Sequence, residues 1–154
     1  MKRRPSLIIA IVSSFLFIIS CATAPPPVPL RDYQPESKDE ASIKEFFVNY
    51  ENLYNAHDVD GLGKLFHPDA QILAGGPDRI TVGTEEYLEM HRESFAKNPN
   101  LRIEFYSPKI KVAEHKAEAT FQIKSPGSGH TNIPPFTYYL VKENGSWLIT
   151  GRKY

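Results

Sequence analysis

The chain has 154 residues and carries 18 basic and 18 acidic side chains, so its net charge is zero when histidine is neutral. This length suits one domain with one hydrophobic core. The balanced charge, with no arginine-rich run beyond the N-terminus, argues against nucleic acid as a partner, and a single cysteine excludes a disulfide framework.

The first 20 residues have the layout of a secretion signal. Lys2, Arg3 and Arg4 form a positive start, and the apolar run Leu7 to Ile19 follows. A transmembrane anchor is the alternative, but this run is shorter than the roughly 20 apolar residues that a spanning helix needs, and two serines interrupt it. We therefore expect residues 1–20 to be a signal peptide.

The single cysteine, Cys21, lies directly after this run. The sequence from Ile18 to Cys21, Ile-Ile-Ser-Cys, resembles the lipobox of bacterial lipoproteins. The resemblance implies that Cys21 is acylated, becomes the first mature residue and holds the protein on the membrane by its lipid. Ala22, where an inner-membrane protein would have Asp, is similar to lipoproteins sent to the outer membrane, facing the periplasm. The alternative is a free thiol behind an ordinary cleavage site.

A proline-rich segment follows the cysteine, with "APPPVPL" and then "RDYQPE". Proline favours extended polyproline geometry, so we expect residues 21–36 to be the lipidated cysteine and a semi-rigid tether of about 40 Å. Loss of the signal peptide removes three basic residues, which leaves 15 basic and 18 acidic residues and a net charge of −3. The folded domain is then expected over residues 37–154.

The first half of this domain predicts three helices. In "SKDE", Ser37 caps the first helix and Glu40 reaches back to the free backbone donors. Asp58 caps a shorter helix that Pro68 brings to an end, and the third helix starts at Thr84. The first and third helices have apolar faces at helical spacing: Ile43, Phe46, Phe47, Tyr50 and Tyr54 on the first, and Tyr87, Leu88, His91 and Phe95 on the third.

The remaining segments predict strands. "AQILA" is the first, and alternating apolar residues predict further strands between residues 101 and 123. Asn144-Gly145 predicts a tight hairpin between the strands Phe136 to Lys142 and Trp147 to Arg152. Helices first and antiparallel strands after them indicate an α+β fold, with helices covering one face of a curved sheet.

The stretches "FFVNYENLYNAHDVDGLGKLFHPDAQI", "GTEEYLEMH" and "YYLVKENGSWLITGRKY" together resemble the nuclear transport factor two-like superfamily. That superfamily includes SnoaL-like cyclases and ketosteroid isomerases, and the resemblance covers residues 40–154. It implies an α+β, cone-shaped fold with N-terminal helices packed in a curved antiparallel sheet. It also implies a hollow cone whose mouth admits ligands.

Resemblance to the isomerases assigns two candidate oxyanion donors. Tyr50 falls at the position of their catalytic tyrosine, and His91 falls where some of them have a second tyrosine bonded to the first. The position of their aspartate base corresponds to Ala74, which cannot take a proton. No acid occurs in the "FTYYL" region either, so we lean against an enzyme.

The cavity-lining residues predicted on this basis are Tyr50, Tyr54, Tyr87, His91, Phe121 and Tyr138. Histidine and aspartate also gather between residues 57 and 69, but without the spacing of a metal site. The sequence predicts neither a metal nor a cofactor.

Three functional hypotheses follow. The first is a lipid-anchored envelope protein whose cone binds a small apolar or amphipathic ligand. The second is a SnoaL-like cyclase or an isomerase-type enzyme with Tyr50 and His91 as oxyanion donors. The third is a non-catalytic interaction domain of an envelope complex, for instance a homodimer through the sheet, which a cone filled by its own aromatic side chains would favour.

Overall fold

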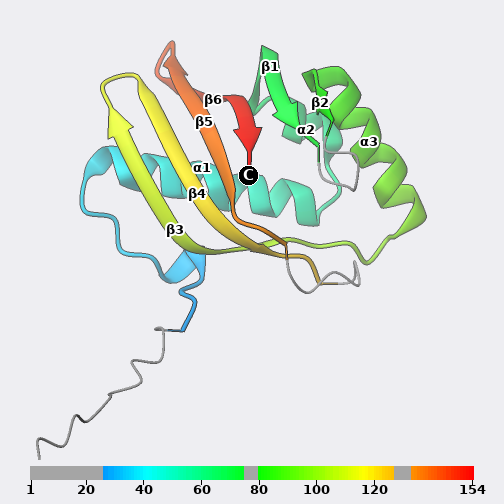
Figure 1. The fold of residues 1–154 in the computed structure, drawn as a ribbon, viewed down its shortest axis with the longest axis horizontal. Helices are drawn as coiled ribbons and strands as arrows, with labels where there is room; N and C mark the ends of the chain where they lie inside the picture. The colour runs from blue at the N-terminus through cyan, green and yellow to red at the C-terminus, as the bar shows by residue number, and fades with distance from the viewer. Residues whose placement is uncertain (1–25, 75–79, 127–132) are drawn as a thin grey trace, which may run out of the picture.

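The computed structural model describes residues 26–74, 80–126 and 133–154 (Figure 1). Cys21 and the expected signal peptide lie outside these residues. Within the described part, no helix is long and apolar enough to cross a membrane. The elements are the 3-10 helix η1 (Leu30–Asp32), the helices α1 (Lys38–Asn55), α2 (Val59–Gly63) and α3 (Thr84–Lys97), and the strands β1 (Phe66–Leu73), β2 (Thr81–Val82), β3 (Glu104–Ala113), β4 (Lys116–Lys124), β5 (Phe136–Glu143) and β6 (Ser146–Lys153).

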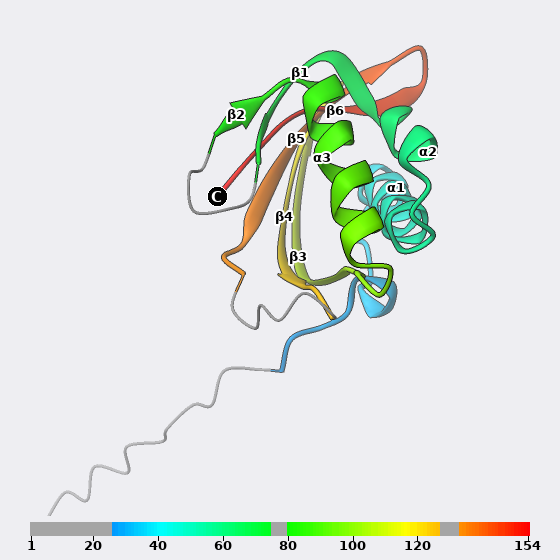
Figure 2. The ribbon, with the colours of Figure 1, turned by 90° about the vertical axis from the view of Figure 1, so that its right-hand side faces the viewer.

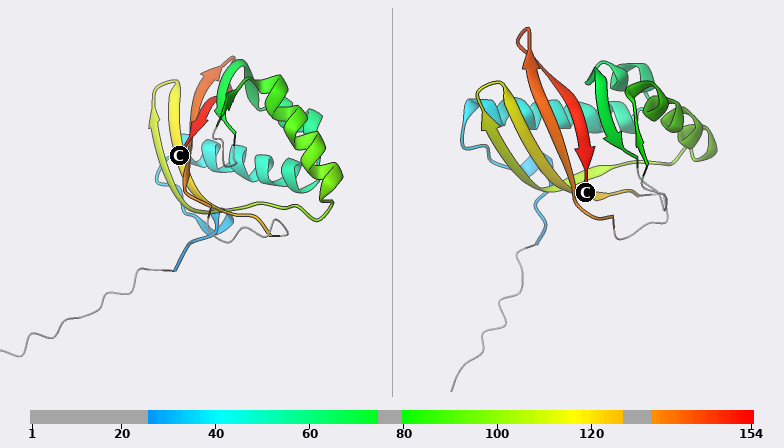
Figure 3. Two further views of the ribbon diagram at one scale, coloured as in Figure 1. Left: turned by 45° about the vertical axis from the view of Figure 1, so that its right-hand side comes forward. Right: turned by 45° about the horizontal axis from the view of Figure 1, so that its top comes forward.

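The strands form one sheet in the order β2-β1-β6-β5-β4-β3. The sheet curves around α1, and α2 and α3 lie on the same side of it, with α3 against β1 and α2 (Figures 2 and 3). The α+β class and the arrangement of helices inside a curved sheet are as predicted. One pairing differs from the antiparallel expectation, because β1 runs parallel to β6 and makes the sheet mixed.

The start of α1 confirms the predicted cap. The Ser37 hydroxyl accepts a hydrogen bond from the Glu40 N–H at 3.1 Å, and the Glu40 carboxylate accepts one from the Glu36 N–H at 2.8 Å. The reciprocal bond therefore goes to the residue before the cap. The apolar stripe of α1 faces the sheet and is buried at Ile43, Phe47, Tyr50 and Tyr54.

The second helix begins as predicted and ends earlier. Asp58 accepts a hydrogen bond from the Gly61 N–H at 2.8 Å, but α2 already ends at Gly63. Pro68 lies inside β1 and does not terminate the helix. The β1–β6 register is irregular between Phe66 and Gln71, so the missing N–H of Pro68 falls where the ladder is already interrupted.

Strand β6 carries one extra residue in its pairing with β5. Leu140 pairs with Ile149 and Tyr139 pairs with Gly151, so Thr150 has no opposite residue. Such a bulge shifts the alternation of side chains by one position. Side chains of β6 alternate between the inner and outer faces of the sheet, and after Thr150 this alternation is shifted by one residue. The predicted Asn144-Gly145 turn is confirmed, since both residues have positive φ.

The chain is already packed on the domain before residue 37. Leu30 is 1% exposed and belongs to the core. Pro29 forms an antiparallel bridge with Tyr106 of β3, and the Ser107 N–H donates to the Val28 carbonyl oxygen at 2.7 Å. The last part of the predicted tether, from Val28 onward, is thus part of the folded unit.

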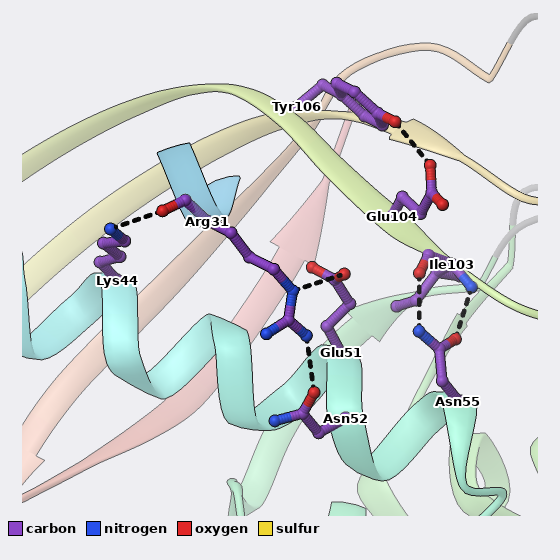
Figure 4. A network of polar contacts seen from close by, with 8 residues as sticks. All are labelled: Arg31, Lys44, Glu51, Asn52, Asn55, Ile103, Glu104 and Tyr106. Carbon is purple, nitrogen blue, oxygen red and sulfur yellow. Dashed lines mark hydrogen bonds and ion pairs between the residues drawn. The ribbon is translucent and has the colours of Figure 1, made fainter. Parts of the chain in front are cut away.

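Polar contacts hold this N-terminal segment on α1 (Figure 4). The Lys44 ammonium donates to the carbonyl oxygens of Arg31 at 2.9 Å and Tyr33 at 2.8 Å. The Arg31 guanidinium donates to the Asn52 side chain at 2.7 Å and lies 3.8 Å from the carboxylate of Glu51. Glu51 is buried, so the segment places a cation beside a carboxylate that has little access to water.

Candidate functional site

A cavity of about 520 Å³ lies between the helices and the inner side of the sheet. Side chains from α1, α3, β5 and β6 line it, because the inward-facing side chains of these elements converge there. The cone is therefore hollow, which the sequence did not decide. The polar groups on its wall include Tyr50, Tyr54, Tyr87, His91, Tyr138 and Arg152; the apolar wall includes Ala74, Met90, Ile103, Ile123 and Phe136.

Five of the six predicted lining residues lie on this cavity, and Phe121 does not. The Phe121 ring is fully buried behind the wall, 4.5 Å from the ring of Phe47 and 4.8 Å from that of Phe105, measured between centroids. Alternation along β4 does turn Phe121 inward, but the rings of α1 and β3 cover it. We correct its role from ligand contact to core packing.

The hydrogen bond implied for Tyr50 and His91 is not formed. The Tyr50 hydroxyl lies 3.2 Å from the hydroxyl of Tyr87, one turn before His91 on α3. His91 instead packs its ring edge-on against Tyr87 at 4.4 Å and Tyr54 at 5.2 Å between centroids. Its Nε2 atom is buried and has no hydrogen-bond partner among the described residues.

These groups are neutral at physiological pH. Burial, and then the charge of Arg152, lower the pKa of His91 to about 3. Burial raises the pKa of Tyr138 to about 12, against the opposing effect of Arg152. Burial also raises the pKa of Tyr50 well above its ordinary value. The cavity therefore offers hydroxyls and a neutral imidazole as hydrogen-bonding groups.

Arg152 brings a positive charge to the same wall. Its Nη1 donates to the Tyr87 hydroxyl at 2.7 Å, and its Nε and Nη2 donate to the Leu73 carbonyl oxygen at 3.1 and 2.6 Å. The guanidinium carbon also lies 4.4 Å from the centroid of the Phe136 ring. Among the residues that the structure describes, no carboxylate forms an ion pair with Arg152. Burial lowers its pKa, but the surrounding tyrosine hydroxyls outweigh that effect and raise it overall.

The sequence analysis did not identify Arg152 as a site residue. Simple alternation from the buried Ile149 would place Arg152 on the outer face, but the bulge at Thr150 reverses the phase and turns it inward. The available signal was Gly151, because glycine inside a strand often marks a bulge or a close backbone approach. A Cβ atom there would lie 3.2 Å from the carbonyl oxygen of Gln71 on β1.

The position of the isomerase base is on the cavity wall and holds Ala74, which has no titratable group. No described lining residue is an aspartate or glutamate. The described part of the chain also has no group of three or more His, Cys, Asp or Glu side chains arranged to hold a metal ion.

Solved structures share this architecture. They include Bd1075 of Bdellovibrio bacteriovorus, at a TM-score of 0.64 and 11% identity over 76% of this chain, which spans only 43% of that protein. A nuclear transport factor two-like protein of unknown function from Shewanella oneidensis matches with a TM-score of 0.63 and 18% identity, over 74% of this chain and 96% of that chain. A cystatin-like domain of unknown function from Nostoc punctiforme matches with a TM-score of 0.61 and 19% identity, over 77% of this chain and 76% of that chain. Identities this low show the fold alone.

No curated protein matches the sequence. The family of SnoaL-like domains, in contrast, matches residues 43–151, from the first half of α1 into the last strand, β6. This match covers more than half of the chain and ends one residue before Arg152. The protein belongs to the SnoaL-like domain family.

Proposed function

We propose that this protein is a lipid-anchored envelope protein whose cone binds a small, largely apolar ligand with a polar group. The observation that carries the proposal is the buried Nε2 atom of His91, which has no described partner and belongs to a side chain on the cavity wall. A buried polar atom left without a hydrogen bond costs about 1–3 kcal/mol. A ligand atom bonded to this nitrogen would remove that cost.

The size and lining of the cavity support binding over a purely structural role. Small-molecule sites typically enclose about 300–1,000 Å³, with mostly apolar walls and a few polar groups that fix orientation. The cavity of about 520 Å³ has this character. An interaction domain without a ligand would be expected to fill its cone with its own side chains.

The second hypothesis, a cyclase or isomerase, lacks an evident base. General acid–base catalysis works best when the pKa of the catalytic group lies near the working pH. The pKa of His91, about 3, and that of Tyr138, about 12, are far from neutral, and Ala74 stands at the base position. These groups suit hydrogen bonding to a ligand better than proton transfer.

Native mass spectrometry of residues 22–154, exported behind a conventional cleavable signal, tests the proposal. This piece avoids the lipid and keeps every described residue, including the buried Leu30. We expect an excess mass that disappears when the protein is denatured. The ligand should be bound less in a His91→Leu variant, which loses the imidazole.

The control is His115→Leu, which removes an exposed imidazole at the turn between β3 and β4. This variant should carry the same excess mass as the wild type. The proposal is contradicted if the wild type carries no excess mass and binds none of 2-naphthoate, 2-naphthamide, octanoate and octanamide in calorimetric titration.

A further inference from the structure

The Arg152 guanidinium carries a partly buried charge without a counter-ion among the described residues. Arginine is seldom buried in this way unless it is paired, because removing a charge from water is costly. The groups around it are the hydroxyls of Tyr87 and Tyr138, the Leu73 carbonyl oxygen and aromatic rings. They satisfy hydrogen bonds and lessen the cost, but they bring no negative charge.

The guanidinium also has an N–H group that is available to a ligand. It has five N–H groups. Nε and Nη2 each use one on Leu73, Nη1 uses one on Tyr87, and the Tyr138 hydroxyl accepts another. One N–H of the guanidinium is therefore left without a partner among the described residues. Since the side chain lies on the cavity wall, a molecule in the cavity can approach it.

We propose that the ligand is an apolar monocarboxylate whose carboxylate is held by Arg152. This inference rests on the proposed function and specifies the chemical class of its ligand. The guanidinium matches a carboxylate in charge, and its remaining N–H can donate a charge-assisted hydrogen bond to a carboxylate oxygen. A doubly charged phosphate fits less well, because Arg152 is the only cationic residue among the described lining residues.

The rest of the wall defines the body of this molecule. Rings of Tyr54, Phe136 and Tyr138, with Ile103 and Ile123, offer an apolar and largely aromatic surface. Such a surface favours an alkyl or aryl group over a sugar or a nucleotide. His91 Nε2 supplies a second, neutral hydrogen-bonding point for a hydroxyl or carbonyl on that body.

The test compares acids with neutral amides of nearly the same shape. Residues 22–154 are titrated calorimetrically with 2-naphthoate and 2-naphthamide, and with octanoate and octanamide. A hydrogen-bonded charge of this kind should make each acid bind about 10- to 100-fold more tightly than its amide. This comparison uses the wild type, so it does not depend on the folding of any variant.

Two variants assign the preference to one residue. Arg152→Gln should abolish it, whereas Lys153→Gln should retain it. Lys153 is the matched control because it is the next cation on β6 and is exposed, with its ammonium 4.8 Å from the centroid of Tyr139. Circular dichroism and thermal unfolding identify variants that are folded before titration.

The outcomes separate the two proposals. Amides that bind as tightly as their acids would overturn the carboxylate inference and leave the binding function standing. A folded Arg152→Gln variant with an undiminished preference for acids would also overturn it. If no compound of either pair binds, the carboxylate inference fails, and the binding function fails with it only when the wild type also carries no excess mass in native mass spectrometry.

Discussion

His91 is the residue whose protonation in the folded state differs most clearly from that of an exposed side chain. Its pKa falls from the ordinary 6.5 to about 3, because burial and the charge of Arg152 disfavour the imidazolium. Tyr54, Tyr87 and Phe95 complete the surroundings of its ring and bring no negative charge. The imidazole can therefore remain neutral in the folded protein at a pH where it would be charged in the unfolded chain.

This difference predicts a pH-dependent stability. Below pH 6.5 the unfolded chain binds a proton at His91 that the folded protein excludes, so the stabilisation present above pH 6.5 is lost as the pH falls towards 3. The loss approaches about 1.4 kcal/mol per pH unit within this window. Urea unfolding between pH 7 and pH 4.5 measures it, and His91→Leu should show a correspondingly shallower decline.

His115→Leu serves as the control, since it removes an exposed imidazole at a turn. Its profile should decline as steeply as that of the wild type. If the profiles of His91→Leu and the wild type are parallel, His91 is not the group that excludes the proton.

At the scale of elements, the N-terminal segment behaves as part of the fold. Leu30 in η1 is 1% exposed, and the bridge between Pro29 and Tyr106 continues the segment along β3. The contacts of Arg31 and Lys44 add polar attachment to α1 (Figure 4). The chain outside the domain is therefore shorter than the proline content indicates.

We predict that Leu30→Ala lowers the free energy of unfolding by about 2–4 kcal/mol, because it leaves a cavity in the core. Denaturant unfolding of residues 22–154 measures the change. Val28→Ala is the matched aliphatic control two residues earlier, and its side chain is 45% exposed, so we expect a loss below about 0.5 kcal/mol. Equal stability of Leu30→Ala and the wild type would mean that η1 is not packed on the domain in solution.

For the molecule as a whole, the docked segment would limit the distance between the domain and a membrane that holds Cys21. Six residues, 22–27, separate Cys21 from Val28, and at about 3.1 Å per residue they span about 20 Å. If Cys21 carries a lipid, as we propose, the domain is held close to the bilayer. A carboxylate-bearing apolar ligand partitions into the bilayer surface, so this location would bring the cone near its source.

The proposed lipid anchor on Cys21 makes a direct prediction. In a bacterial host fed an alkyne-labelled palmitate, the wild-type protein should incorporate the label and sediment with membranes. Cys21→Ser should incorporate none, because the chain has no other cysteine. Thr23→Ser, which alters a neighbouring hydroxyl residue only slightly, should be labelled as the wild type is. Label recovered on the Cys21→Ser protein would contradict the lipoprotein assignment.

Elements that depend on neighbours along the chain were predictable from the residues alone. Ser37 and Asp58 cap α1 and α2 through residues three positions away, and Asn144-Gly145 sets its own turn. The apolar stripes of α1 and α3 likewise predicted four of the cavity residues, because helical periodicity is local. These interactions are short in sequence, so their patterns can be read without knowing the fold.

Which groups meet in the cavity depends instead on contacts between segments far apart in the sequence. The bulge at Thr150 depends on how β6 pairs with β5 and β1, and it alone turns Arg152 towards Tyr87, 65 residues away. Burial behind the rings of α1 and β3 likewise removed Phe121 from the wall. Strand register and the packing between distant segments fix these positions, and a single sequence encodes them only through the whole fold.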